Sequence, residues 1–208
     1  LGERTSTGDI EGDIVERKPV TVTREQLESV LMQFVGALQQ VPPMHSALKR
    51  DGKPLYEYAR AGITLQREPR AVYIHTLELL EFAPPQLRLR VRCSKGTYVR
   101  VLGEDIGAAL GCGAHLGILR RTAIGGLAMT HAVTLEQLAA CPADERGQYL
   151  RPVDTLLSSF PALVLDDTLA RRFRQGQRIA LERAGVSLPS TSGRVRVYDA
   201  QAALVGTG

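Results

Sequence analysis

Cysteine is scarce in this sequence, and long apolar runs are absent from it. The three cysteines, Cys93, Cys112 and Cys141, are odd in number and show no CxxC spacing, so we expect no disulfide framework. No uninterrupted apolar stretch is long enough to span a bilayer, and no signal-peptide pattern opens the printed sequence. We therefore predict a cytoplasmic protein that has no membrane partner.

The charge of the chain is mildly basic and unevenly placed. Lys and Arg number 26 against 22 acidic residues, which gives a formal charge of +4 and a pI near 9.1. The cations gather at residues 88–100 and 118–121. Clustering of this kind favours a nucleic-acid surface over diffuse surface charge.

Two stretches of different pattern indicate two domains. Residues 1–152 alternate strand and helix patterns, whereas residues 160–208 carry short strands, a basic helix at 168–174 and a Ser-, Pro- and Gly-rich loop at 185–193. The second stretch is too short to bury much core alone. The sequence starts at Leu1 without an initiator methionine and stops as a strand pattern begins, so we expect both ends to be incomplete.

Residues 87–110 join a strand pattern to a helix pattern across a short charged turn. Before the turn, apolar residues alternate with three arginines, which predicts a strand with one buried and one solvated face. A second strand at 70–82 precedes it, and the short link between them predicts an antiparallel hairpin. Helical spacing begins at Val99, so Tyr98 and Arg100 reach the first turn of a helix.

A cation at a helix N-terminus is unusual, because the helix dipole disfavours it by roughly 0.3 to 1 kcal/mol. Lys95, Arg100 and the free backbone donors would together bind an anion, either a phosphate or a buried carboxylate. The alternative is that Arg100 pairs with Glu104 one turn later, in the weaker orientation with the cation first.

A second candidate segment lies at residues 42–62. It follows an amphipathic helix that is predicted to start at the Thr23 capping box, to run through Leu38 and to end at the prolines 42 and 43. The segment is expected to be an exposed loop that leads into a short helix at 54–60. Its basic residues beside two tyrosines suit nucleic acid, although the lysines could equally be ordinary solvated side chains. The candidates are His45, Lys49 and Lys53.

Downstream, residues 116–121 are expected to form a strand that places Arg120 and Arg121 at one end, and residues 134–141 to form a short helix. Two candidate metal sites lack the ligand pattern that their metal requires. The alternating acids at 9–13 lack the glycine and glutamate spacing of a calcium loop. The Cys112 and His115 pair has no second pair nearby for zinc. We predict no metal.

Four blocks of sequence, in order and without large gaps, resemble the bacterial TruB-type tRNA pseudouridine-55 synthases. The blocks are LGERTSTGDIEGD, VPPMHSALKRDGKPLYEYARAG, CSKGTYVRVLGEDIG and LGCGAHLGILRR. The resemblance covers most of residues 1–160. The tail from Phe160 to Gly208 is similar, more loosely, to the PUA-type RNA-binding domain that many members carry.

The resemblance implies isomerisation of one uridine in the TΨC stem-loop of tRNA, by breaking its N-glycosidic bond and rejoining the ribose to carbon 5. It implies no cofactor and no metal, and a base that leaves the stack to reach the enzyme. Arg100 would pair with the catalytic carboxylate, Tyr98 would lie against the flipped base, and Leu119 would contact the target nucleotide. Asp9 matches a loop residue near the active site. Lys49 and Arg60 would contact the RNA backbone.

The family's nucleophile is an Asp in a GxLDP motif that precedes LGERT, and no aspartate in this sequence has that context. Neither Asp105 nor Asp154 matches it. We therefore expect this polypeptide alone to be inactive and Arg100 to lack its carboxylate, an unpaired buried charge that would cost on the order of 3 to 5 kcal/mol.

The expected fold is α+β, with a mixed, mostly antiparallel sheet and flanking helices over residues 1–152 and a small β-rich, PUA-like domain over 160–208. The expected function is tRNA pseudouridine synthesis by a monomer whose partner is tRNA. Two alternatives remain: a non-catalytic tRNA-binding or RNA-folding module, and a guide-RNA-dependent modification subunit. The presence of a GxLDP motif upstream in the full gene product would indicate the enzyme, and its absence would indicate the first alternative.

Overall fold

The computed structural model describes residues 1–181 and 193–208. The chain divides into two compact units, Leu1–Leu119 and Arg120–Gly208. Both contain helices and short strands, so the α+β fold class is confirmed. Among the described residues, no helix combines the length and apolar character needed to cross a membrane.

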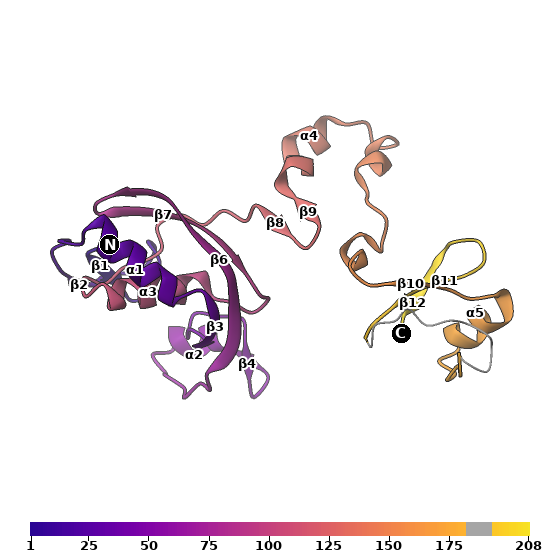
Figure 1. Ribbon diagram of the computed structural model, residues 1–208, viewed down its shortest axis with the longest axis horizontal. Coiled ribbons are helices and arrows are strands. Elements are labelled where there is room, and N and C mark those ends of the chain that lie inside the picture. Colours follow the sequence, from indigo (N-terminus) through magenta and orange to yellow (C-terminus); the bar gives the residue numbers. More distant parts are fainter. Residues whose placement is uncertain (182–192) are drawn as a thin grey trace. The chain divides into compact units, whose positions relative to one another are not determined.

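The first unit is built on a three-stranded antiparallel sheet in the order β3-β6-β7 (Figure 1). Its strands are β3 (Gly36–Gln40), β6 (Arg70–Ala83) and β7 (Gln86–Cys93). The predicted hairpin of β6 and β7 is confirmed. Because side chains alternate along each strand, Leu79 opposite Leu89 faces the core, while Glu78 opposite Arg90 faces solvent.

Helices α1 (Arg24–Gln33) and α3 (Val99–Ala109) pack on the apolar face of this sheet. Full burial of a large apolar side chain contributes roughly 1.5 to 3 kcal/mol, so these contacts hold the sheet and helices together. The best buried members of this core are Leu27, Leu31, Ile74, Leu102 and Ile106.

The predicted length of α1 is wrong. The Thr23 capping box starts the helix as expected, but the helix ends at Gln33 rather than at the prolines. Gly36 adopts φ 105°, a conformation that L side chains rarely accept, and the chain turns there into β3. The apolar residues from 35 to 38 therefore belong to the turn and the strand.

Two small hairpins flank the sheet. Strands β1 (Glu3–Thr5) and β2 (Ile14–Arg17) pair in an antiparallel manner and carry the acidic loop between them. Strands β4 (Lys49–Arg50) and β5 (Lys53–Pro54) lead into α2 (Leu55–Arg60), which confirms the predicted short helix. Residues 42–48 form no helix or strand, as expected of a loop, whereas residues 49–60 form this hairpin and helix.

In the second unit, residues 120–160 form only short elements. The helix α4 (Leu135–Ala140) starts at the Thr134 capping box as predicted. The other short elements are two strands, β8 (Ala123–Ile124) and β9 (Leu127–Ala128), and three 3-10 helices, η1 (Met129–His131), η2 (Arg146–Tyr149) and η3 (Thr155–Leu157).

The predicted strand over residues 116–121 is wrong. Leu116 makes one isolated parallel bridge to Asp9, and the residues after it form no ladder. Ile118 is 91% exposed, so its apolar side chain fills no core. Alternating apolar residues predict a strand only where a neighbouring strand is present to pair with them.

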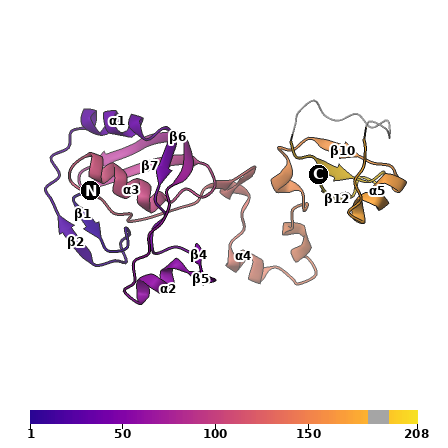
Figure 2. The same cartoon turned by 90° about the horizontal axis from the view of Figure 1, so that it is seen from below.

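The end of the chain forms a three-stranded sheet in the order β10-β11-β12, and Figure 2 labels its two outer strands. The strands β10 (Ala162–Val164), β11 (Arg196–Tyr198) and β12 (Leu204–Thr207) are joined by one parallel and one antiparallel pairing. Helix α5 (Asp167–Arg174) covers it and contributes Leu169 and Ala170 to a separate core. The predicted loop at 185–193 lies almost entirely outside the described residues.

Candidate functional site

The turn between β7 and α3 is fixed by side-chain to backbone hydrogen bonds. The Thr97 hydroxyl donates to Ser94 O at 2.9 Å, and Gly96 takes a positive φ of 84°. Tyr98 is the N-cap of α3, and its side chain makes no capping bond. The predicted placement of Arg100 in the first turn of the helix is therefore correct.

Gln40, at the end of β3, supplies the missing cap from a distance. Its side-chain oxygen accepts from Tyr98 N at 3.0 Å, and its amide nitrogen donates to Tyr98 O at 3.3 Å. Gln40 is only 2% exposed, so the side chain that pairs with both backbone groups is itself buried and hydrogen-bonded. Sequence reasoning missed this residue, because a single glutamine in a strand carries no local signal.

The Arg100 guanidinium joins three segments of the first unit. One nitrogen donates to Asp9 Oδ2 at 2.9 Å and to Thr7 O at 3.1 Å, and the other donates to His45 O at 2.5 Å. The prediction that Arg100 would be an unpaired charge is wrong, since Asp9, 91 residues away in sequence, supplies a carboxylate. This carboxylate is not the nucleophile that the family resemblance pairs with Arg100. The partner of Arg100 is therefore a partly buried carboxylate, that of Asp9, and not the carboxylate of Glu104.

Asp9 is held in place by its own loop. The Thr7 hydroxyl donates to Asp9 Oδ1 at 2.7 Å, and the Glu11 backbone N–H donates to the same oxygen at 3.3 Å. These donors, with Arg100, lower the pKa of Asp9 below its usual value against the opposing effect of burial, and Thr7 makes the largest contribution. Asp9 therefore remains an anion that fixes the guanidinium.

Glu104 lies one helical turn after Arg100 but makes no ion pair with any described residue. Its carboxyl group lies against Gly8, where a Cβ would fall 2.8 Å from Glu104 Oε2. Gly8 also has φ +76°, so a side chain at that position would be strained as well as crowded. Burial raises the pKa of Glu104 despite the nearby arginines.

A pocket of about 360 Å³ opens beside the Arg100 and Asp9 pair. His45 and Arg60 also line it, so four of the predicted site residues meet there. The Arg60 guanidinium lies 5.2 Å from the centre of the Tyr56 ring, a cation–π arrangement that presents both a charge and an aromatic surface.

The remaining predicted residues lie outside this pocket. Lys49 and Lys53 are exposed on the β4 and β5 hairpin, which adjoins α2. Lys95 is exposed in the turn before α3. Leu119 closes the first unit, 62% exposed, and the exposed Arg120 and Arg121 begin the second.

The described residues contain no cluster of three or more His, Cys, Asp and Glu side chains that could hold a metal ion. Cys112 is a buried free thiol, and His115 hydrogen-bonds to Glu3 O through Nδ1 at 3.2 Å.

Three family models cover nearly the whole chain. The TruB family pseudouridylate synthase N-terminal domain matches residues 1–99, the tRNA pseudouridylate synthase B C-terminal domain matches 100–158, and the pseudouridine synthase II TruB C-terminal model matches 161–208. This chain belongs to the TruB family of pseudouridine synthases. The fold and the four ordered sequence blocks agree with that assignment.

Relatives with assigned names are highly similar. The chain is 56% identical over 207 residues to the tRNA pseudouridine synthase B of Burkholderia mallei (strain NCTC 10247), an alignment that covers 99% of this chain and 68% of that protein. It is 53% identical over 218 residues to the protein of the same name from Ralstonia pickettii (strain 12J), with 99% and 67% covered. These TruB proteins are therefore longer than the chain described here.

Solved structures share the fold. A chain in the crystal structure of a Cbf5-Nop10-Gar1 complex superposes with a TM-score of 0.69 at 24% identity, covering 91% of this chain and 56% of that one. A chain of the archaeal box H/ACA sRNP Nop10-Cbf5 complex gives a TM-score of 0.64 at 22% identity, with 90% and 54% covered. The present chain spans just over half the length of these structural neighbours.

Proposed function

We propose that the whole protein, of which this chain is the Arg100-bearing part, converts a uridine of the tRNA T stem-loop to pseudouridine. The observation that carries this proposal is the oriented guanidinium of Arg100 at the start of α3, beside a pocket that is also lined by basic side chains. The names of the relatives, all tRNA pseudouridine synthase B, support the substrate class.

The reaction breaks the bond between N1 of uracil and C1′ of ribose and forms a bond from C5 to C1′. The C5 proton is lost to solvent, and N1 gains a proton. In the family, an Asp in a GxLDP motif is the nucleophile, and this sequence contains no such motif. The proposal therefore places the nucleophile in a part of the whole protein outside these 208 residues.

Arg100 has the capacity to bind that second carboxylate while it keeps Asp9. A guanidinium carries five N–H donors, and the described contacts of Arg100 are the three bonds to Thr7, Asp9 and His45. The remaining donors are available for the nucleophile. In this arrangement Asp9 is a positioning residue, and Arg100 contacts the reacting group.

Access of the base to this pocket requires that it leave the helical stack, which costs a few kcal/mol. We propose that the exposed cations Lys49, Lys53 and Arg60 offset this cost through phosphate contacts, and that Tyr98 and Leu119 contact the extruded nucleotide. Lys95, His45, Arg120 and Arg121 complete the proposed RNA surface. The reaction as written consumes no cofactor, and we propose a monomer acting in the cytoplasm.

The domain assignment is also a proposal. We infer that residues 1–152 belong to the catalytic domain and that residues 160–208 form a PUA-like RNA-binding domain. Support comes from the separate apolar core of the final sheet, centred on Leu163, Leu165 and Val197. Three arginines, Arg171, Arg172 and Arg174, lie in the last turn of α5 and give that domain a basic helix end.

The direct test is to incubate the whole protein with an unmodified tRNA transcript and to map pseudouridine nucleotide by nucleotide. The expected product is a single pseudouridine in the T loop. No pseudouridine, or pseudouridine only in other loops, would contradict the proposal. The 208-residue polypeptide, tested in parallel, is expected to bind the transcript but to leave it unconverted.

A second candidate function is a module that binds or folds tRNA without modifying it, a role for which the exposed cations suffice and no nucleophile is needed. The same experiment separates the two. If the whole protein binds the transcript with high affinity but forms no pseudouridine, the binding module is correct and the enzyme is not.

A further inference from the structure

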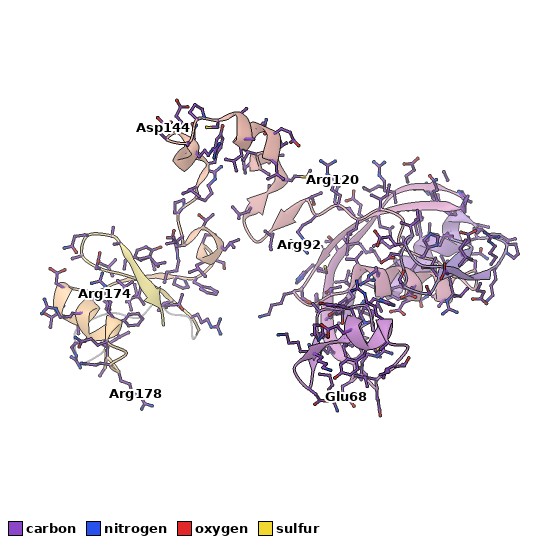
Figure 3. The ribbon with its side chains drawn as sticks, turned by 180° about the vertical axis from the view of Figure 1, so that it is seen from behind. Glu68, Arg92, Arg120, Asp144, Arg174 and Arg178 are labelled. Atoms are coloured by element: carbon purple, nitrogen blue, oxygen red, sulfur yellow. The ribbon has the colours of Figure 1, made fainter. Side chains whose placement is uncertain are left out.

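The sheet of the first unit has one covered and one open face. Helices α1 and α3 bury the apolar side. On the opposite side, Tyr73 is 48% exposed, and His75 and Arg92 are also exposed. Figure 3 labels Arg92, whose side chain extends from β7.

On the open face, the arginines of β7 are paired with acidic residues, except for the arginine nearest the C-terminal end of the strand. Two of the β7 arginines meet acids of β6: Arg88 lies 3.4 Å from Glu81, and Arg90 lies 2.8 Å from Glu78. Arg92, the third arginine of the same row, is paired across the ladder with Thr76 rather than with an acid. It forms no ion pair within residues 1–181 and 193–208, so its charge remains available to a partner.

Two aromatic rings lie on the same face as this cation. The centres of the Tyr73 and His75 rings are 5.0 Å apart, and their planes are tilted by 43°. The ladder has an irregularity between Ile74 and Thr76, which turns His75 outward beside Thr76. The cross-strand neighbour of Tyr73 is Ala37, whose small side chain leaves the tyrosine ring open.

This ring pair adjoins the turn that leads to Arg100. Ser94 N donates to Tyr73 O at 2.8 Å, and Tyr73 N donates to the Ser94 hydroxyl at 2.9 Å. Ser94 is the first residue of the turn that carries Lys95. The ring pair is therefore hydrogen-bonded through its backbone to the turn that carries Lys95 and leads to Arg100.

We propose that Tyr73, His75 and Arg92 form an accessory RNA-binding surface, which stacks an unpaired base on the rings and holds a backbone phosphate on the guanidinium. Aromatic surfaces next to unpaired cations are the features that bind single-stranded nucleic acid. An acidic protein segment would also be attracted by Arg92, but it would make no use of the paired rings. The inference rests on the proposed tRNA substrate and extends its contact area.

The test uses the whole protein and a T stem-loop RNA with single-stranded flanks, and it measures affinity as a function of salt. Arg92→Gln is expected to reduce the slope of log affinity against log salt by about 0.7 to 0.9, the contribution of one phosphate contact. The matched control is Arg88→Gln on the same row of β7, whose guanidinium is already paired with Glu81. Equal slopes for the two variants would overturn the proposal.

A second pair of variants tests the rings. Tyr73→Ala is expected to weaken binding by about 5- to 100-fold, and Tyr73→Phe, which keeps the ring, to bind like wild type. Thermal melting identifies any variant that has lost its fold, and only folded variants are compared. Equal affinities for folded Tyr73→Ala and wild type would overturn the stacking role.

Conversion of tRNA by wild type, measured on the same preparations, separates the two proposals. If wild type forms pseudouridine and the Arg92 and Tyr73 variants bind normally, the accessory surface is wrong and the proposed function stands. If the variants weaken binding but wild type forms no pseudouridine, the surface stands and the proposed function is wrong.

Discussion

Arg100 and Asp9 form an ion pair of 2.9 Å between the first turn of α3 and the loop that joins β1 to β2. Both side chains are about three-quarters buried, at 23% and 24% exposure. The pair means that the guanidinium is already oriented by residues of this chain, before any other carboxylate approaches it. A pre-oriented charge costs no reorganisation during a reaction.

Asp9→Asn should disturb both stability and turnover. The substitution removes the negative charge and leaves a partly buried guanidinium without it, which should cost roughly 1 to 3 kcal/mol of unfolding free energy. Turnover by the whole protein should fall by at least about tenfold, because Arg100 is no longer fixed. Urea unfolding and tritium release from labelled tRNA measure the two effects. Asp13→Asn is the control and should match wild type, because Asp13 lies in the same loop and its carboxylate bonds to none of the residues that the structure describes.

Thr7→Val should make stability less dependent on pH. The Thr7 hydroxyl is the largest cause of the lowered pKa of Asp9, and a lowered pKa stabilises the fold above the ordinary value of 3.8. That stabilisation is lost as pH falls through the folded-state pKa. The variant should therefore be less stable than wild type at pH 7, and the difference should vanish in strong acid. A constant difference across all pH values would show that Asp9 ionisation is not involved.

Glu104→Gln should raise the free energy of unfolding at pH 7, whereas Thr7→Val should lower it. Burial raises the pKa of Glu104, so its ionised form destabilises the fold at pH values above the folded-state pKa, and this cost is absent below 4.5. The glutamine variant should be more stable than wild type at pH 7 and equal to it in acid. Denaturant unfolding at several pH values measures this. Glu68→Gln, an exposed site, controls for the general loss of one negative charge.

Gln40→Leu should destabilise the start of α3. The change removes the acceptor of Tyr98 N and leaves this partly buried N–H without its side-chain partner, which should cost about 1 to 3 kcal/mol. Tyr98 O loses the bond from the Gln40 amide but keeps the bond that it accepts from Leu102 N at 3.0 Å. Gln39→Leu is the matched control, because the adjacent side chain lies on the exposed side of the same strand. Similar losses in the two variants would remove the capping role from Gln40.

Periodicity in the sequence was sufficient to predict the elements with strong local patterns. The β6 and β7 hairpin and α3 follow from their alternation and helical spacing, and α4 follows from its capping box. The end of α1 could not be located in this way, because apolar residues continue past the helix into β3. Only the backbone of Gly36 changes the direction of the chain there.

The site was less predictable than the fold. Arg100 was singled out by its position at a helix start, but its partner was not, since the ion pair spans 91 residues and three acids alternate in the partner's loop. Local pattern also failed at Ile118, where apolar residues have no neighbouring strand. Long-range contacts of this kind depend on packing that a single sequence does not display.

The most direct test of the central claim is tritium release from carbon-5-labelled uridine in a T stem-loop, measured in single turnover with the whole protein and its Arg100→Ala and Arg100→Lys variants. Both variants should release tritium at least about 100-fold more slowly than wild type while binding the RNA with similar affinity. Arg88→Ala, on the exposed face of β7, should release it at a rate close to that of wild type. Wild-type rates in the Arg100 variants would contradict the account, because the guanidinium would then have no part in the reaction.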